Sequence, residues 1–118
     1  MKKETFTRFE INGIGIFHLL DKIDKIPETE FKEEDDFKYT DAVYHFEKDL
    51  PIPNLYKSTN KKTISFFTEE GLSFFKESIE DLVDVIETYI DKVTIITIKD
   101  IEKDKILYRD KYQIIIEK

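Results

Sequence analysis

The stretch TEEGLSFFKESIEDLVDVIETYID, residues 68–91, decides the fold of this chain. Its apolar residues recur at steps of three, four and one, which is the period of an α-helix and not that of a strand. They form one stripe, made of Leu72, Phe75, Ile79, Leu82, Val83, Ile86, Tyr89 and Ile90. The pattern predicts one long amphipathic helix whose apolar face belongs to the core.

The first turn of this helix carries its own start signals. Thr68 is a good N-cap, because its hydroxyl can accept a hydrogen bond from an otherwise unpaired backbone N–H group of the first turn. Glu69 and Glu70 follow, where the helix dipole favours negative charge. Gly71 is predicted to be the weak point, since glycine in a helix costs roughly 1 kcal/mol relative to alanine.

The opposite face of the predicted helix is acidic. Its members are Glu77, Glu80, Asp81, Asp84, Glu87 and Asp91. Carboxylates three or four residues apart on a helix repel each other by about 0.2–0.5 kcal/mol per pair. Residues 69–91 carry eight acids and one lysine, a net charge of −7, which equals the formal net charge of the whole chain. The charge imbalance therefore lies on one helix, and the rest of the chain is balanced.

The composition predicts one globular domain that covers residues 1–118, with 40% hydrophobic and 38% charged residues. The absence of cysteine excludes disulfide and thiolate chemistry. No apolar run approaches the roughly 18 residues of a membrane span, and the first residues lack an apolar signal segment. We therefore expect a cytoplasmic protein with no membrane partner. The negative net charge argues against direct nucleic-acid binding.

Upstream of the helix, the strongest local signal is that of a β-hairpin. Residues 5–11 alternate in polarity, and Asn12-Gly13 is a dipeptide favoured in two-residue hairpin turns. Residues 14–20 then either return as a second strand or begin a helix near Ile16. Residues 27–36, with six acids and one lysine, predict a mobile surface loop. Residues 37–49 fit a short helix or a strand, and the prolines that follow cannot lie inside a helix.

Short apolar runs predict the remaining strands. Residues 63–67 (TISFF) predict a short buried strand that leads into the helix. Residues 93–98 (VTIITI) are apolar on both faces, which predicts a strand covered on both sides or placed centrally in a sheet. Residues 106–108 and 112–116 predict an antiparallel pair, the second being an exposed edge that could join two subunits. The fold class is α+β, with an antiparallel or mixed sheet of about five or six strands packed on the long helix.

The sequence carries no recognisable motif for catalysis or for metal or cofactor binding. His18 and His45 match no metal-ligand spacing, and His45 beside Tyr44 or Glu47 is only a candidate general base. No serine stands in a G-x-S-x-G context. The basic cluster in residues 57–62 is typical of a solvated turn. We predict no catalytic residue, no metal ligand and no cofactor.

The acidic face has two interpretations. It is either a solvated surface of a purely structural domain or an interaction surface for a basic protein. The Cβ atoms of carboxylates three and four residues apart on a helix are about 5–6 Å apart, which is comparable to the spacing of phosphates along one strand of nucleic acid. The row can therefore imitate nucleic acid toward a groove lined by arginine and lysine, with Phe74 and Val85 beside it as an apolar anchor. We expect a small, non-enzymatic, monomeric or homodimeric protein that binds or inhibits a basic, nucleic-acid-binding partner.

Four segments resemble, in the same order, small proteins encoded by phages and prophages of low-GC bacteria. The segments are NGIGIFHLL, DLPIP, SFFTEEGLSFF and IITIKDIEKDKILYRDKYQIII. In those proteins a GxGxY hairpin, a proline-containing middle, an FxSxEQLxxWF helix and a closing pair of strands recur. The resemblance implies a mobile-element accessory protein, whose partner would be a host nuclease or another nucleic-acid-binding defence protein.

The layout is also similar to a reduced ADP-ribosyltransferase core. That family binds NAD with an arginine on its first strand, a serine on a middle strand and a late glutamate, and Arg8, Ser65 and Glu117 stand at loosely matching places. The chain departs from the family pattern at Lys111, where the glutamate usually leads into its strand, and beside Ser65, which lacks flanking hydroxyl residues. The resemblance implies, as the alternative function, an NAD-binding ADP-ribosyltransferase-like enzyme or a degenerate relative of one.

Overall fold

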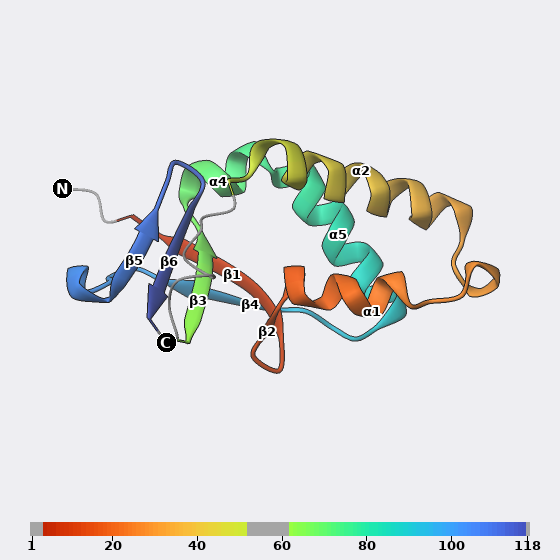
Figure 1. Cartoon of the computed structure of the whole chain (residues 1–118), viewed down its shortest axis with the longest axis horizontal. Helices are drawn as coiled ribbons and strands as arrows, with labels where there is room; N and C mark the ends of the chain where they lie inside the picture. The colour runs from red at the N-terminus through yellow and green to blue at the C-terminus, as the bar shows by residue number, and fades with distance from the viewer. Residues whose placement is uncertain (1–3, 52–61, 118) are drawn as a thin grey trace.

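The computed structural model describes residues 4–51 and 62–117 and has an α+β fold (Figure 1). The strands, α-helices and short 3-10 helices (η) are, in chain order, β1 (Phe6–Ile11), β2 (Ile14–Gly15), η1 (Ile16–Leu19), α1 (Leu20–Asp24), η2 (Glu28–Glu30), α2 (Glu33–Asp49), β3 (Thr63–Phe67), α4 (Glu69–Phe74), α5 (Lys76–Tyr89), β4 (Thr94–Ile98), η3 (Lys103–Lys105), β5 (Ile106–Arg109) and β6 (Gln113–Glu117). The predicted fold class is confirmed, and the sheet is antiparallel with six described strands.

The sheet runs in the order β2-β1-β3-β6-β5, and β4 pairs with the other side of β1. Residues 6–10 of β1 pair continuously with β4. On its opposite side β1 has two partners, because Thr7 pairs with Phe67 of β3 whereas the last two residues of β1 pair with β2. The sheet therefore forks at Arg8, which lies between the residue of β1 that pairs with β3 and the two residues that pair with β2.

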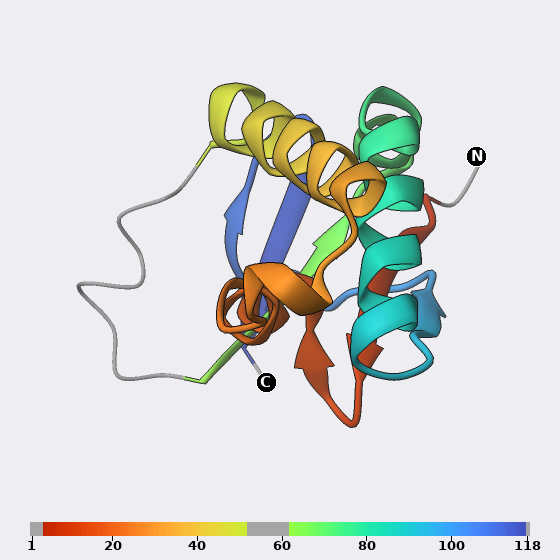
Figure 2. The same ribbon diagram turned by 90° about the vertical axis from the view of Figure 1, so that its right-hand side faces the viewer.

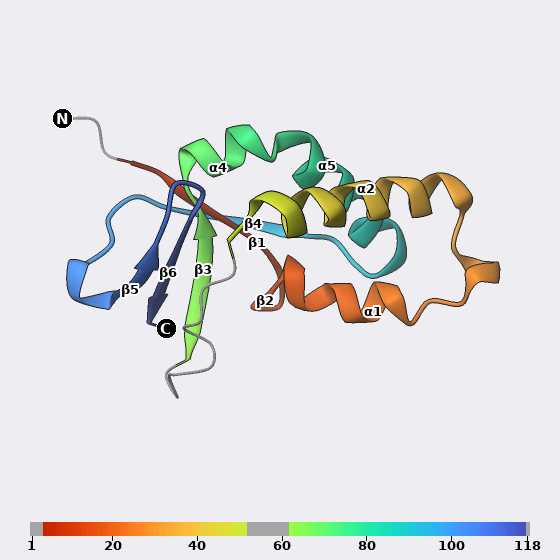
Figure 3. The same ribbon diagram turned by 45° about the horizontal axis from the view of Figure 1, so that its top comes forward.

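Both faces of the sheet bury apolar side chains. The larger core lies between the sheet and the helices and contains Ile11, Ile16, Leu19, Ile23, Ala42, Phe46, Phe67, Phe75, Ile79, Leu82, Val85, Ile86 and Val93. The smaller core on the other face contains Phe6, Phe66 and Ile114, with isoleucines of β3 to β6 packed against them. Figure 3 shows α1 and α2 toward one end of the molecule and β5 and β6 toward the other.

Residues 68–91 form two helices, α4 and α5, and the prediction of one continuous helix is wrong. The break lies at Phe75, whose backbone (φ −98°, ψ 14°) leaves the helical region. Its ring is fully buried and stacks on Phe46 of α2, with 4.9 Å between ring centroids. The break keeps α4 at the end of β3 while α5 turns toward α1 (Figure 1). The helix therefore breaks where the Phe75 ring packs against α2. The regular spacing of apolar residues in 68–91 gave no sign of this break.

The predicted start of α4 is confirmed, but the role of Gly71 differs from the prediction. The Thr68 hydroxyl accepts a hydrogen bond from the Gly71 N–H group (2.9 Å) and donates one to the Lys111 carbonyl (2.7 Å). The Thr68 N–H group donates to the Tyr112 carbonyl at 3.0 Å. A Cβ atom on Gly71 would lie 2.0 Å from that same carbonyl oxygen. Glycine is therefore required by the close approach of the β5–β6 turn and is not a weak point.

The β5–β6 turn is held by one carboxylate, that of Asp110. It accepts hydrogen bonds from the N–H groups of Tyr112 (2.8 Å) and Gln113 (3.0 Å) and from the Tyr108 hydroxyl (2.6 Å). Burial by itself raises the pKa of Asp110, but these hydrogen bonds outweigh it and hold the pKa below its ordinary value of 3.8. The hydrogen bond from the Tyr108 hydroxyl to Asp110, with a smaller contribution from burial, raises the pKa of Tyr108 to about 12.

Replacing Asp110 with asparagine is expected to make the protein less stable and less sensitive to acid. A carboxylate with a lowered folded pKa contributes stability that is present above its unfolded pKa and lost as the pH falls through the folded pKa. We expect a loss of about 1 kcal/mol at neutral pH, because the site is partly exposed. The difference from the wild type should begin to shrink near about pH 4 and continue to shrink as the pH falls further. Urea unfolding at several pH values measures both, and a difference unchanged at about pH 2 contradicts this role.

At the N-terminus, both predicted structures occur, each in a shorter form. The hairpin turn is confirmed, since Asn12 and Gly13 have φ values of 49° and 84°, as a type I′ turn requires. The returning strand β2, however, has only two residues and is followed directly by η1 and α1. The physical reason is burial, because Ile16, Leu19 and Ile23 all enter the larger core at helical spacing.

Residues 27–49 contain the longest helix of the described chain rather than a loop and a short element. Helix α2 spans 17 residues and begins with four consecutive acids, Glu33, Glu34, Asp35 and Asp36. These acids favour a helix start, because they lie at the positive end of the helix dipole. The loop predicted for residues 27–36 is therefore wrong at residues 33–36, which belong to α2, and at residues 28–30, which form η2. The helix ends at Asp49, just before Pro51, as the prolines require.

The predicted positions of two strands are exchanged. The run at residues 93–98 forms β4, which pairs with β1 alone among the described residues, and its Ile95 is 63% exposed. The run at residues 112–116 forms β6, which lies between β3 and β5 with Ile114 and Ile115 fully buried. Strand β3 is confirmed. The basic cluster predicted in the turn after Pro53 lies outside the described residues except for Lys62.

Candidate functional site

The six predicted acidic residues lie along α5 and the turn after it, and five of them are exposed, Asp81 being half-buried. Three have hydrogen-bond partners among the described residues. Asp84 accepts a hydrogen bond from Lys38 of α2 (2.7 Å), and this contact raises the pKa of Lys38. Glu87 accepts from the Val93 N–H group at 3.0 Å, and Asp91 accepts from the Lys92 N–H group. The row is therefore less uniform than the sequence predicted.

Helix α2 extends the acidic surface. Residues 33–49 carry seven acids and two lysines, a net charge of −5, and α2 packs against α5 (Figure 2). Residues 69–91 contribute −7, so the remainder of the chain has a net charge of +5. The charge is thus divided between an acidic pair of helices and a mildly basic remainder. Outside residues 69–91 the charges cancel, as the sequence indicates, but the sum of zero combines −5 on residues 33–49 with +5 elsewhere.

The apolar residues predicted beside the acidic face behave differently from each other. Val85 is fully buried against the core and is not available as an anchor. Phe74 is 45% exposed, and its ring stacks on that of Tyr112 with 4.8 Å between centroids. Only Phe74 therefore remains as a candidate contact for a partner.

His45 joins the two acidic helices. Its Nδ1 atom forms a hydrogen bond with the Ser78 hydroxyl of α5 (2.7 Å), and its Nε2 atom lies 3.4 Å from the Asp49 carboxylate. These partners are not the Tyr44 and Glu47 expected from the sequence. Ser78 is buried and lines neither of the two cavities described below. The arrangement consequently serves packing between α2 and α5.

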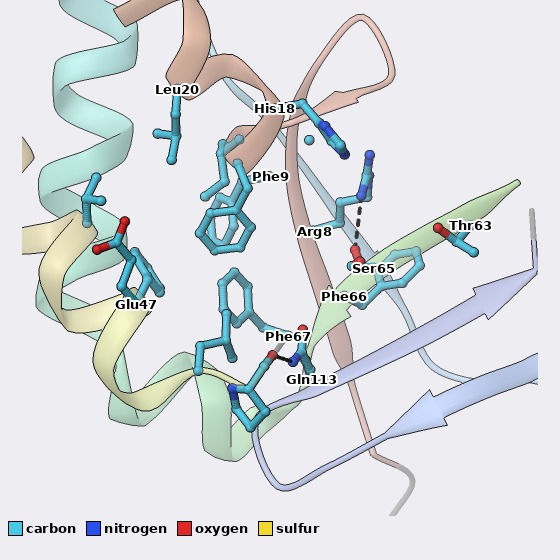
Figure 4. Close-up of a pocket in the computed structure, with 17 residues that line it drawn as sticks. Arg8, Phe9, His18, Leu20, Glu47, Thr63, Ser65, Phe66, Phe67 and Gln113 are labelled. Carbon is cyan, nitrogen blue, oxygen red and sulfur yellow. Dashed lines mark hydrogen bonds between the residues drawn. The ribbon is translucent and has the colours of Figure 1, made fainter. Parts of the chain in front are cut away.

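A pocket of about 330 Å³ opens beside the fork in the sheet (Figure 4). Five phenylalanines from four separate elements line it, namely Phe9, Phe17, Phe46, Phe66 and Phe67. The rings of Phe17 and Phe46 meet edge to face with 5.0 Å between centroids. A largely apolar cavity of this size with few polar groups lies at the lower end of the range of about 300–1,000 Å³ for small-molecule sites.

Arg8 is the main polar group of this fork pocket. Its Nε atom donates to Glu10 (2.7 Å), one Nη atom to the Ser65 carbonyl (3.1 Å) and the other to the Gly13 carbonyl (3.3 Å). A Cβ atom on Gly15 would lie 3.1 Å from both Nη atoms, so glycine leaves room for the guanidinium. The side chains of Arg8 and Glu10 are only 12% and 13% exposed. The guanidinium therefore bridges the two branches of the fork.

The structure brings together two of the three residues singled out by the resemblance. Arg8 contacts the backbone of Ser65, and both line the fork pocket (Figure 4). Glu117 pairs with Thr63, another lining residue, but does not itself line the pocket. His18, which the sequence left without a role, lies at the pocket near Arg8. The phenylalanine walls were missed, because no local pattern indicates which rings of a 118-residue chain will meet.

In residues 4–51 and 62–117, no group of three or more histidine, aspartate or glutamate side chains is placed to hold a metal ion. Within the same ranges, no helix has the length and apolar character needed to cross a membrane. Comparison with protein-family models, with curated proteins and with solved structures finds no match for this chain.

Proposed function

We propose that the protein binds a nucleotide of the NAD class in the fork pocket. The observation that carries the proposal is the guanidinium of Arg8, which is fixed at the fork and lines an aromatic-walled cavity. The three hydrogen bonds of Arg8 use three of its five N–H groups, which leaves two without a hydrogen bond among the described residues and open to a ligand. Phenylalanine rings offer flat apolar surfaces on which an aromatic base or nicotinamide ring can pack.

The positive charge of Arg8 is compensated by a neighbouring carboxylate. The pocket is therefore expected to recognise a ligand by hydrogen bonds and not by strong attraction of an anion. Glu10 lies 2.7 Å from Arg8 and compensates its charge. Gln113, whose side-chain amide donates to the Pro51 carbonyl, and Thr63 add further polar groups to the lining. NAD is the first candidate ligand because Arg8 and Ser65, the residues implied by the ADP-ribosyltransferase resemblance, lie together. Since Glu117 does not line the pocket, binding is proposed and catalysis is not.

Millimolar NAD is expected to raise the melting temperature. A ligand at ten times its Kd stabilises the folded state by about 1.4 kcal/mol, which corresponds to about 4–6 °C for a chain of this size. Phe17→Ala removes part of the pocket wall and should reduce the shift. Phe37→Ala is the matched control, because Phe37 is 64% exposed and outside the pocket. Thermal unfolding with NAD, ADP-ribose and nicotinamide tests this, and no shift with any of them contradicts the proposal.

A second candidate function is the binding of a basic, nucleic-acid-binding protein by the acidic pair of helices. The observation that favours it is the adjacency of α2 and α5, with net charges of −5 and −7 over residues 33–49 and 69–91. Two neighbouring acidic helices produce a wider field than one, and such fields accelerate association with a cationic partner. A phage-encoded inhibitor of a host nuclease is the role that the resemblance suggests for this surface.

The double variant Glu77→Lys/Glu80→Lys is expected to reduce capture of basic proteins from a bacterial lysate at low salt. Raising the salt to about 0.5 M should weaken capture by the wild type, because exposed charges are then screened beyond a few ångströms. The matched control is Glu102→Lys/Asp104→Lys, which reverses two exposed acids outside α2 and α5. Equal capture by the wild type and the helix variant is the result that excludes this function.

A further inference from the structure

Strand β4 presents an open edge without the features that usually protect one. Among the described residues it pairs only with β1, and its register with β1 is uninterrupted over five residue pairs. Residues 94–98, TIITI, contain no charge and no proline. By contrast, β2 has only two residues, and β5 carries a register shift between Ile106 and Tyr108. Natural edges are normally shortened, charged or bulged, so β4 is the described edge available for pairing.

An apolar groove of about 560 Å³ lies directly beside this edge. Its floor is formed by Phe9 of β1 and Ile95 of β4, which are opposite each other in the sheet, and its wall by Leu72, Ile79 and Val83. Ile95 is 63% exposed at the open side. Every second residue of an edge strand directs its N–H and C=O groups away from the sheet, so backbone hydrogen-bonding groups and apolar surface are offered together.

The charged residues around the groove favour a partner of positive charge. Glu69 and Glu80 line it together with a single base, Lys76, and α5 with its row of acids lies over this side of the sheet (Figure 2). A second copy of the chain added edge to edge would place two α5 helices on the same side of one continuous sheet, where their charges repel. A cationic strand has the opposite sign and is therefore favoured over self-association.

We propose that β4 and this groove bind an extended, basic segment of a partner protein by β-strand addition. The segment pairs with the open edge of β4 through its backbone, as in other β-augmentation complexes. Because strand side chains alternate between faces, the residues that face the groove are two apart. The segment therefore presents an apolar residue to Ile95 and a lysine or arginine two positions away to Glu80. This site shares Phe9 with the fork pocket and Glu80 with the acidic face.

A display library of random short peptides, selected on the immobilised full chain, tests the proposal. We expect enriched peptides to carry an apolar and a basic residue two positions apart. The affinity of the best peptide should fall about tenfold in Ile95→Lys and in Glu80→Lys, since a cation then lies in the groove or on its rim. Glu77→Lys is the matched control on the same helix outside the groove and should change the affinity by less than about twofold. Amide exchange at residues 94–98 should slow in the complex.

Four outcomes overturn the proposal. The first is the absence of enriched peptides, and the second is undiminished binding to Ile95→Lys when its melting temperature matches that of the wild type. The third is an equal loss in Glu77→Lys and Glu80→Lys, which indicates diffuse attraction to the acidic face rather than seating in the groove. The fourth is slow amide hydrogen exchange in β4 of the protein alone, together with a dimer that forms as the concentration rises. That result would mean that the edge of β4 pairs with a second copy of the chain.

Discussion

Gly71→Ala is expected to destabilise the protein by about 3 kcal/mol, although helix propensity alone predicts a gain of about 1 kcal/mol. The added Cβ atom would lie 2.0 Å from the Tyr112 carbonyl oxygen and 2.9 Å from its carbonyl carbon. The atoms it meets are backbone atoms and cannot rotate away. Relief of the clash must separate α4 from the β5–β6 turn, which weakens the hydrogen bonds from Thr68 to Tyr112 and Lys111.

Urea unfolding of Gly71→Ala and of Ser73→Ala measures this effect. Ser73 lies two residues further along α4 and is exposed, so its replacement should change the free energy of unfolding by less than about 0.5 kcal/mol. A Gly71→Ala protein as stable as the wild type, or more stable, shows that the turn and the helix are not in contact. An equal loss in both variants attributes the effect to the helix itself.

Arg8→Met is expected to cost about 3 kcal/mol, the second large effect. The substitution leaves the Glu10 carboxylate, which is 13% exposed, without its cation and deprives the Ser65 and Gly13 carbonyls of a donor. Removing one partner of a largely buried ion pair costs about 3–5 kcal/mol, and the partial exposure here lowers that figure. The matched control is Lys38→Met, because the Lys38–Asp84 pair is exposed to solvent and its loss should change the stability far less.

A double variant separates charge from packing at the fork. If the uncompensated carboxylate dominates, adding Glu10→Gln to Arg8→Met should recover about 1 kcal/mol of the lost free energy of unfolding. If the lost contacts to Ser65 and Gly13 dominate, the second substitution lowers stability further. Urea unfolding of both single variants and the double variant completes the cycle. A loss below about 1 kcal/mol in Arg8→Met contradicts the bridging role of the guanidinium.

Signals that depend on a few neighbouring residues were predicted correctly. The Thr68 cap and the Asn12-Gly13 turn are local, since each requires only the backbone conformation of residues a few positions away. The apolar stripe of residues 68–91 likewise predicted which face is core. It did not predict the break at Phe75, because that ring packs on Phe46 of a distant helix.

The candidate site was less predictable than the fold. Arg8 and Ser65 are 57 residues apart in the chain and were named only through a family resemblance. The phenylalanines that wall the fork pocket come from four elements, and no spacing rule joins them. The acidic face of α5 was evident from the sequence, but the contribution of α2 was not, because a run of acids is typical of both a loop and a helix start.

The sequence by itself determined the α+β class, the apolar and acidic faces of residues 68–91, the cap at Thr68 and the hairpin turn. Only the tertiary structure decided that β4 is an edge and β6 is interior, that Gly71 is required, and that the sheet forks at Arg8. The reason is the range of the interactions. Periodicity and turn chemistry act within one or two turns of chain, whereas edges, close approaches and pockets arise where segments distant in sequence compete for the same space.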